Sequence, residues 1–142
     1  MEARDGSPLK PGCILVAPPG YQLVVQDGRV RLLDTPRVNG VKPAIDPLFQ
    51  SGAREYGPRV VAVVLTGTLS DGSAGLTAVR KAGGVAVVQD PNDAAYSDMP
   101  QSALDTAGAD YCVPLKDMAP LLESLSRQGS EEDAGELVSP VT

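Results

Sequence analysis

Two uninterrupted apolar runs, within residues 59–66 and 85–89, dominate the hydrophobic pattern of this chain. Each is followed by a polar loop and then by apolar residues at helical spacing. A run that is apolar at every position indicates a strand buried on both faces, as in a parallel sheet. The pattern therefore predicts parallel strands, each leading into a helix.

Turn and capping signals predict the remaining elements. The Asp-Gly turn at 27–28 lies between β-rich runs, which is typical of a hairpin. Asp46 and Pro47 suit the N-cap and first position of a helix. The predicted order is a buried strand at 13–17, hairpin strands at 21–25 and 30–33, a long loop at 34–44, a helix from 46, a strand at 59–66, a helix at 71–82, a strand at 85–89, a helix at 99–107, a strand at 111–114 and a helix at 117–127.

This alternation predicts an α/β fold, a doubly wound and mostly parallel sheet with helices on both faces and an antiparallel hairpin at one edge. Residues 1–127 are expected to form one domain. Residues 128–142 are rich in Gly, Ser and Glu, and we expect a disordered acidic tail there.

The composition excludes several classes of function. The net charge of −6 argues against nucleic acid as a partner, because such binding depends on Lys and Arg neutralising phosphates. No apolar run approaches the length of a membrane span, and the polar first twelve residues do not have the pattern of a signal peptide, so we expect a cytoplasmic protein without membrane insertion. Cys13 and Cys112 lie in short apolar runs and are expected to be buried, reduced thiols. The chain has no histidine, so no metal site is expected.

Asp71, in the turn after the run at 59–66, occupies the most informative position. Ligands and catalytic groups of open α/β sheets gather at the carboxyl ends of strands. Asp71 could cap the following helix, a role for which Ser70 competes, or it could orient a catalytic histidine. A phosphate cradle at 67–72 is disfavoured, because the turn lacks a P-loop lysine and Asp71 would repel the anion. No cofactor is therefore expected.

The loop after the run at 85–89 is also acidic and should lie at the same end of the sheet. Its Asp90 and Asp93 do not follow the pattern of an EF-hand, so a solvated turn with Asx caps is the simpler interpretation. Tyr56, Tyr96 and Met99 are expected to be packing residues. The serines have no adjacent base, and so the residues alone supply one well-placed acid and no complete catalytic set.

Five blocks of the sequence together resemble the CheB-type chemotaxis methylesterase domain, in the order found in that family. They cover roughly residues 6–125, and their residues are most similar to those of a diverged branch of the family. The blocks are Val16-Ala17-Pro18-Pro19-Gly20, Pro43-Ala44-Ile45-Asp46-Pro47-Leu48-Phe49, Leu65-Thr66-Gly67-Thr68-Leu69-Ser70-Asp71-Gly72, Gly83-Gly84-Val85-Ala86-Val87-Val88-Gln89-Asp90 and Met99-Pro100-Gln101-Ser102-Ala103-Leu104.

The resemblance implies a serine hydrolase that demethylates, and in some members deamidates, glutamyl and glutaminyl side chains of chemoreceptors. It implies a Ser–His–Asp triad in which Asp71 is the acid. The family's Ser and His precede the block at Val16, so we expect this chain to lack both, together with the N-terminal part of the fold, and to be inactive alone. Gln22 and Val41 stand where the family commonly has histidine. The alternative is a non-catalytic remnant that binds a partner at an exposed sheet edge.

Overall fold

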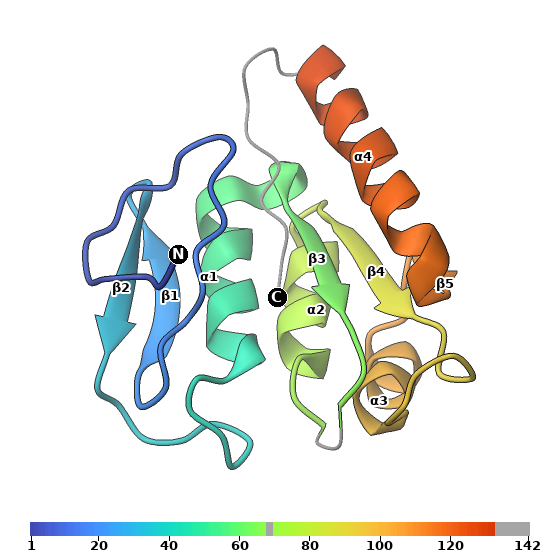
Figure 1. Cartoon of the computed structure of the whole chain (residues 1–142), viewed down its shortest axis with the longest axis horizontal. Coiled ribbons are helices and arrows are strands. Elements are labelled where there is room, and N and C mark those ends of the chain that lie inside the picture. The colour runs from blue at the N-terminus through green and yellow to red at the C-terminus, as the bar shows by residue number, and fades with distance from the viewer. Residues whose placement is uncertain (68–69, 133–142) are drawn as a thin grey trace.

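The computed structural model describes residues 1–67 and 70–132, and Figure 1 shows the arrangement of its elements. In chain order they are β1 (Gln22–Gln26), β2 (Arg29–Leu33), α1 (Ile45–Tyr56), a 3-10 turn η1 (Gly57–Arg59), β3 (Val61–Val64), α2 (Ser73–Lys81), β4 (Val85–Gln89), α3 (Asp98–Thr106), β5 (Tyr111–Val113) and α4 (Leu115–Glu132).

The predicted parallel sheet is confirmed. Its three described strands have the order β3-β4-β5, and both neighbouring pairs run parallel. Val61 lies opposite Val85, and Val87 lies opposite Tyr111. The carboxyl ends of the strands therefore share one edge, at the bottom of Figure 1, where α1 and α2 also begin.

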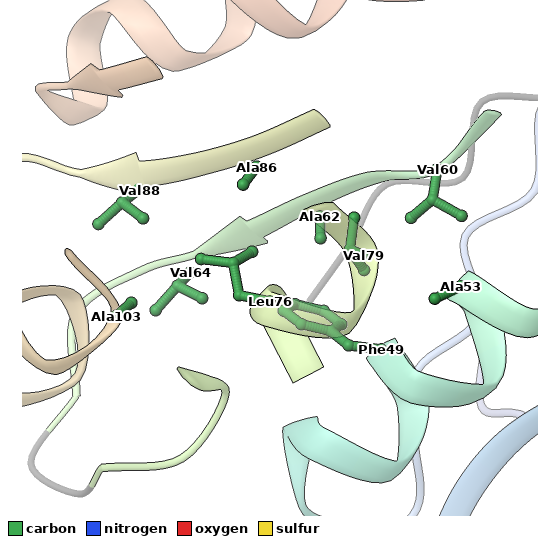
Figure 2. Close-up of a cluster of buried hydrophobic side chains, with 10 residues drawn as sticks. All are labelled: Phe49, Ala53, Val60, Ala62, Val64, Leu76, Val79, Ala86, Val88 and Ala103. Atoms are coloured by element: carbon green, nitrogen blue, oxygen red, sulfur yellow. The ribbon is translucent and has the colours of Figure 1, made fainter. Parts of the chain in front are cut away.

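Helices cover both faces of the sheet, and the side chains of β3 are therefore all buried. Ala62 and Val64 point toward α2, where they join Leu76 and Val79 in the cluster shown in Figure 2. Alternate residues of β3 pack with Met118 and the other buried residues of α4 on the opposite face. The predicted doubly wound α/β class is thus confirmed.

The predicted hairpin is also confirmed, but β1 and β2 form a separate two-stranded sheet and not an edge of the parallel sheet. Asp27 and Gly28 both have positive φ, as a two-residue type I′ turn requires. Helix α1 lies between this hairpin and α2 (Figure 1). The backbone N–H of Val25 donates to the buried hydroxyl of Ser51 in α1 at 3.0 Å, which fastens the hairpin to the helix.

Two predictions, for the segment 13–17 and for the two cysteines, are wrong. Residues 13–17 form no strand; Val16 makes only an isolated bridge to Glu2, because prolines flank the segment closely. Cys13 and Cys112 are exposed rather than buried. Cys13 follows the turn at residues 11–12, outside both sheets, and Cys112 lies in β5, a terminal strand of the sheet whose side chains are not fully covered.

Helix ends also differ from the prediction. Helix α1 begins one residue before Asp46, so Asp46 lies in its first turn instead of serving as the N-cap. Helix α4 continues to Glu132, beyond the predicted end at 127, and the rest of the predicted tail lies outside the described residues. No helix in the described part of the chain is both long and apolar enough to cross a membrane.

Candidate active site

Asp71 lies between β3 and α2, at the edge of the sheet where the strands end. Its exposed fraction is only 4%. The next residue, Gly72, has a φ of 103°, and a Cβ there would lie 3.3 Å from Ile45 Cγ2. The turn therefore brings Asp71 close to the first turn of α1.

Asp71 caps α1, not the helix that follows it. Its Oδ2 accepts the backbone N–H of Ile45 at 2.6 Å, and its Oδ1 accepts that of Asp46 at 3.3 Å. These are N–H groups of the first turn, which have no partner within the helix. A carboxylate also interacts favourably with the positive end of the helix dipole. The structure thus supports capping by Asp71 but assigns it to a different helix.

Asp46 makes the reciprocal contact. It is 6% exposed, and its Oδ1 accepts the backbone N–H of Gly75 in the first turn of α2 at 2.7 Å. The two helices approach closely here, because a Cβ at Gly75 would lie 2.6 Å from Phe49 Cβ. Asp71, just before α2, therefore caps α1, and Asp46 in α1 caps α2. The two acids lie side by side.

Asn39 joins the two acids and was missed by the sequence analysis. Its Nδ2 donates to Asp46 Oδ2 at 2.6 Å and to Asp71 Oδ1 at 3.0 Å. The signal for its position was the Asn-Gly pair between Val38 and Val41, which is typical of a tight turn. Nothing in the sequence indicated that this turn would reach the turn at Asp71.

The acidic loop after β4 has a different character. Asp93 is exposed, and its Oδ2 accepts N–H groups from Gln89 at 3.0 Å and Leu115 at 2.8 Å. The hydrogen bond from the Leu115 backbone, followed by that from Gln89, lowers the pKa of Asp93 below its usual value. Asp90 accepts the N–H of Asn92 at 2.9 Å. These contacts are those of the predicted turn with Asx caps.

The end of β3 is fastened to the loop that leads to α3. Thr66 Oγ1 donates to the carbonyl of Tyr96 and accepts its N–H, at 3.0 and 2.7 Å. A Cβ at Gly67 would lie 2.3 Å from Met99 Sδ, so a larger residue there would displace the Met99 side chain. Met99 and Tyr56 pack as predicted. The packing role predicted for Tyr96 is wrong: its side chain is 60% exposed, because the backbone of the loop makes the contacts.

Other sites in the described residues do not add chemistry to this edge. No group of three or more Cys, Asp or Glu in residues 1–67 and 70–132 could hold a metal ion. An open pocket of about 510 Å³ lies at the opposite end of α2 from Asp71. It is lined by Thr77, Arg80, Lys81, Gly83, Gly84, Ala107 and Asp110.

A buried carboxylate held by backbone N–H groups can orient an imidazole and stabilise the imidazolium that forms when it takes a proton. The chain has no histidine to receive this help. The hydroxyl groups of Ser73 and Ser102, 3.0 Å apart, have each other as partners. The geometry of Asp71 is thus one that suits an acid beside a histidine, and the histidine is not among the residues of this chain.

Comparison with known proteins gives one consistent result. The sequence model of the CheB methylesterase family matches residues 1–122. A protein-glutamate methylesterase/protein-glutamine glutaminase of Anaeromyxobacter dehalogenans is 40% identical over 126 residues, which are 89% of this chain and 37% of that protein. A putative protein of the same name from Leptospira interrogans is 36% identical over 132 residues, or 92% of this chain and 68% of its own length.

The fold agrees with these matches. The crystal structure of the Thermotoga maritima CheB methylesterase catalytic domain superposes with a TM-score of 0.82 at 33% identity, covering 87% of this chain and 68% of that domain. The chain thus spans only part of the relatives' length. The family match covers residues 1–122, and the superposition covers 87% of the chain. This chain belongs to the CheB methylesterase family.

Proposed function

We propose that this chain is the part of a protein-glutamate methylesterase domain that supplies the acid of a Ser–His–Asp triad, and that Asp71 is that acid. The observation that carries the proposal is the position of Asp71: a buried carboxylate at the carboxyl end of β3, held by backbone N–H groups of α1. The names of the relatives support the reaction, which is hydrolysis of methyl esters on glutamyl side chains. By family resemblance, the substrates are methylated chemoreceptors.

The reaction needs two further groups. A serine hydroxyl attacks the ester carbonyl, and a histidine takes its proton and returns it to the departing methanol. The acid fixes the orientation of that histidine and stabilises its charged form. Because this chain has no histidine, we propose that a segment equivalent to the unmatched third of the relatives' domain supplies the serine and the histidine.

A chimeric domain tests this proposal. The part of the Thermotoga maritima catalytic domain that precedes the matched region is fused to the N-terminus of this chain. Release of methanol is then measured with a chemoreceptor fragment whose glutamates carry methyl esters. We expect turnover by the folded chimera and none by this chain alone. Asp71→Asn should lower kcat about 10⁴-fold, as loss of a triad acid does.

Asp105→Asn is the matched control, since Asp105 is exposed on α3 and its side chain contacts only Gln101 in the described structure. A chimera whose Asp71→Asn variant keeps its activity would show that Asp71 is not the acid. A folded chimera that binds the receptor fragment without turnover would instead favour the alternative function, a non-catalytic module that binds a partner.

A further inference from the structure

The turn that carries Asn39 is built to hold one geometry. Val38 and Val41 exchange both backbone hydrogen bonds at 3.0 Å, and between them Asn39 and Gly40 have φ values of 54° and 79°. This is the pattern of a type I′ turn, in which asparagine tolerates the left-handed conformation. The tip of the turn therefore presents the Asn39 side chain in a defined direction.

The buried side chain of Gln22 also fixes the loop on both sides of this turn. Gln22, 2% exposed, donates through Nε2 to the carbonyls of Pro36 and Val41, at 3.2 and 3.3 Å. Its Oε1 accepts the N–H of Ala44 at 2.8 Å. One buried side chain of β1 thus holds the loop on both sides of the turn, so that Asn39 is positioned before any ligand arrives.

The side-chain amide of Asn39 lies between two buried carboxylates and donates a hydrogen bond to each. Asp46 and Asp71 are both buried, and no Lys or Arg in the described residues forms an ion pair with either carboxylate. Adjacent like charges repel each other strongly where water is excluded. The Nδ2 of Asn39 reduces this repulsion, because it donates one hydrogen bond to each carboxylate. The orientation of the amide is determined, because the flipped amide would place its oxygen against two carboxylates.

We propose that Asn39 is a positioning residue, which fixes the carboxylate of Asp71 in the orientation needed by the catalytic base and keeps Asp46 beside it. This proposal rests on the proposed function of Asp71. The N–H groups of Ile45 and Asp46 hold the carboxylate from the side of α1, and Asn39 holds it from the opposite loop. Glycine would suit the turn equally well, so the amide group itself is what the site uses.

The first test uses the unmodified chain. Asn39 and Asn92 are its only asparagines, so selective ¹⁵N labelling of asparagine gives two side-chain amide groups, each with one pair of proton signals. Asn92 is exposed, and its side chain has no partner in the described structure. We expect the Asn39 amide protons to be shifted downfield and to exchange at least tenfold more slowly than those of Asn92. Signals and exchange rates that match between the two residues would overturn the proposal.

The second test uses the chimera described above. Asn39→Gly removes the amide and keeps the turn, because glycine favours the left-handed conformation. We expect kcat to fall about tenfold to hundredfold, as small errors in the orientation of a catalytic group do, with KM unchanged. Thr35→Gly, at an exposed position of the same loop, is the control and should change neither constant.

The outcomes separate the two proposals. Failure of the proposed function appears as an inactive chimera without any substitution at Asn39, while the amide signals of the isolated chain still report whether Asn39 holds the two acids. Failure of the present proposal appears as wild-type kcat for Asn39→Gly in an active chimera. An effect on KM alone, or on folding without an effect on kcat of the folded protein, would also contradict a positioning role.

Discussion

Two acidic turns follow neighbouring strands of the same sheet, yet the acid of one turn is buried and those of the other lie at the surface. Asp71, in the turn after β3, and Asp46, beside it in the first turn of α1, are buried and held by backbone N–H groups of two helices. Asp90 and Asp93, after β4, lie at the surface and cap their own loop and the start of α4. A position at the carboxyl end of a strand is therefore insufficient to define a site. Enclosure by preorganised donors is what distinguishes the first turn from the second.

The largest expected difference between the two turns is in stability. Asp71→Ala removes the cap of α1, so the backbone N–H groups of Ile45 and Asp46 and one of the two amide N–H groups of Asn39 lose their acceptor. An unsatisfied buried donor costs about 1–3 kcal/mol, so we expect a loss of about 3 kcal/mol in the free energy of unfolding. Urea denaturation followed by circular dichroism measures this. Asp93→Ala is the comparison and should shift the midpoint much less, and equal shifts would remove the distinction.

Close packing between α1 and α2 gives the next effect. Gly75→Ala places a methyl group 2.6 Å from Phe49 Cβ and 3.1 Å from Asp46 Oδ1, so the helices must separate. We expect destabilisation of about 1–3 kcal/mol despite the better helix propensity of alanine. Gly52→Ala in α1 is the matched control, because a Cβ there meets nothing within 4 Å. It should stabilise the chain by up to about 1 kcal/mol, and the same sign for both variants would contradict close packing at Gly75.

The sequence predicted the strands and helices because their signals are local. The β-branched run of β3, the Asp-Gly turn between β1 and β2, and the paired glycines after α2 each act within a few residues. The position of Asp71 after β3 followed from the same pattern. The alternation of strands and helices predicted the fold class, and the family resemblance added the triad role of Asp71.

The contacts of the site could not be predicted, because they join segments distant in sequence. Asp71 caps a helix that begins 26 positions earlier, and Asn39 reaches Asp71 across 32 positions. Capping rules assign an acid to the helix that follows it. They therefore predicted that Asp71 caps α2 and that Asp46 is the N-cap of α1. The exposure of Cys112 escaped prediction for a similar reason, since burial depends on which strand lies at the end of the sheet. Cys13 is exposed because the segment 13–17 forms no strand.

The exposed turn should show its own pH dependence. Hydrogen bonds from Leu115 and Gln89 lower the pKa of Asp93 in the folded chain, relative to about 3.9 when unfolded. A lowered pKa gives stability that is present above the unfolded value and is lost as the pH falls through the folded value. Wild-type chain should therefore exceed Asp93→Asn in melting temperature near neutral pH, and this difference should shrink below about pH 4. A difference that is constant across this range would show that the carboxylate charge is not involved.

The smallest expected effect concerns Cys112, which lies close to the same turn. Partial burial, and then the negative charge of Asp90, raises the pKa of the Cys112 thiol. Asp90→Asn should lower that pKa and speed alkylation by iodoacetamide near neutral pH by about two- to threefold, because thiolate is the reactive form and the interaction is screened by solvent. Cys13, also exposed, is the internal reference and should react at the same rate in both proteins. An unchanged Cys112 rate would mean that water screens the acids of this turn completely, which would sharpen the contrast with the enclosed pair at Asp71.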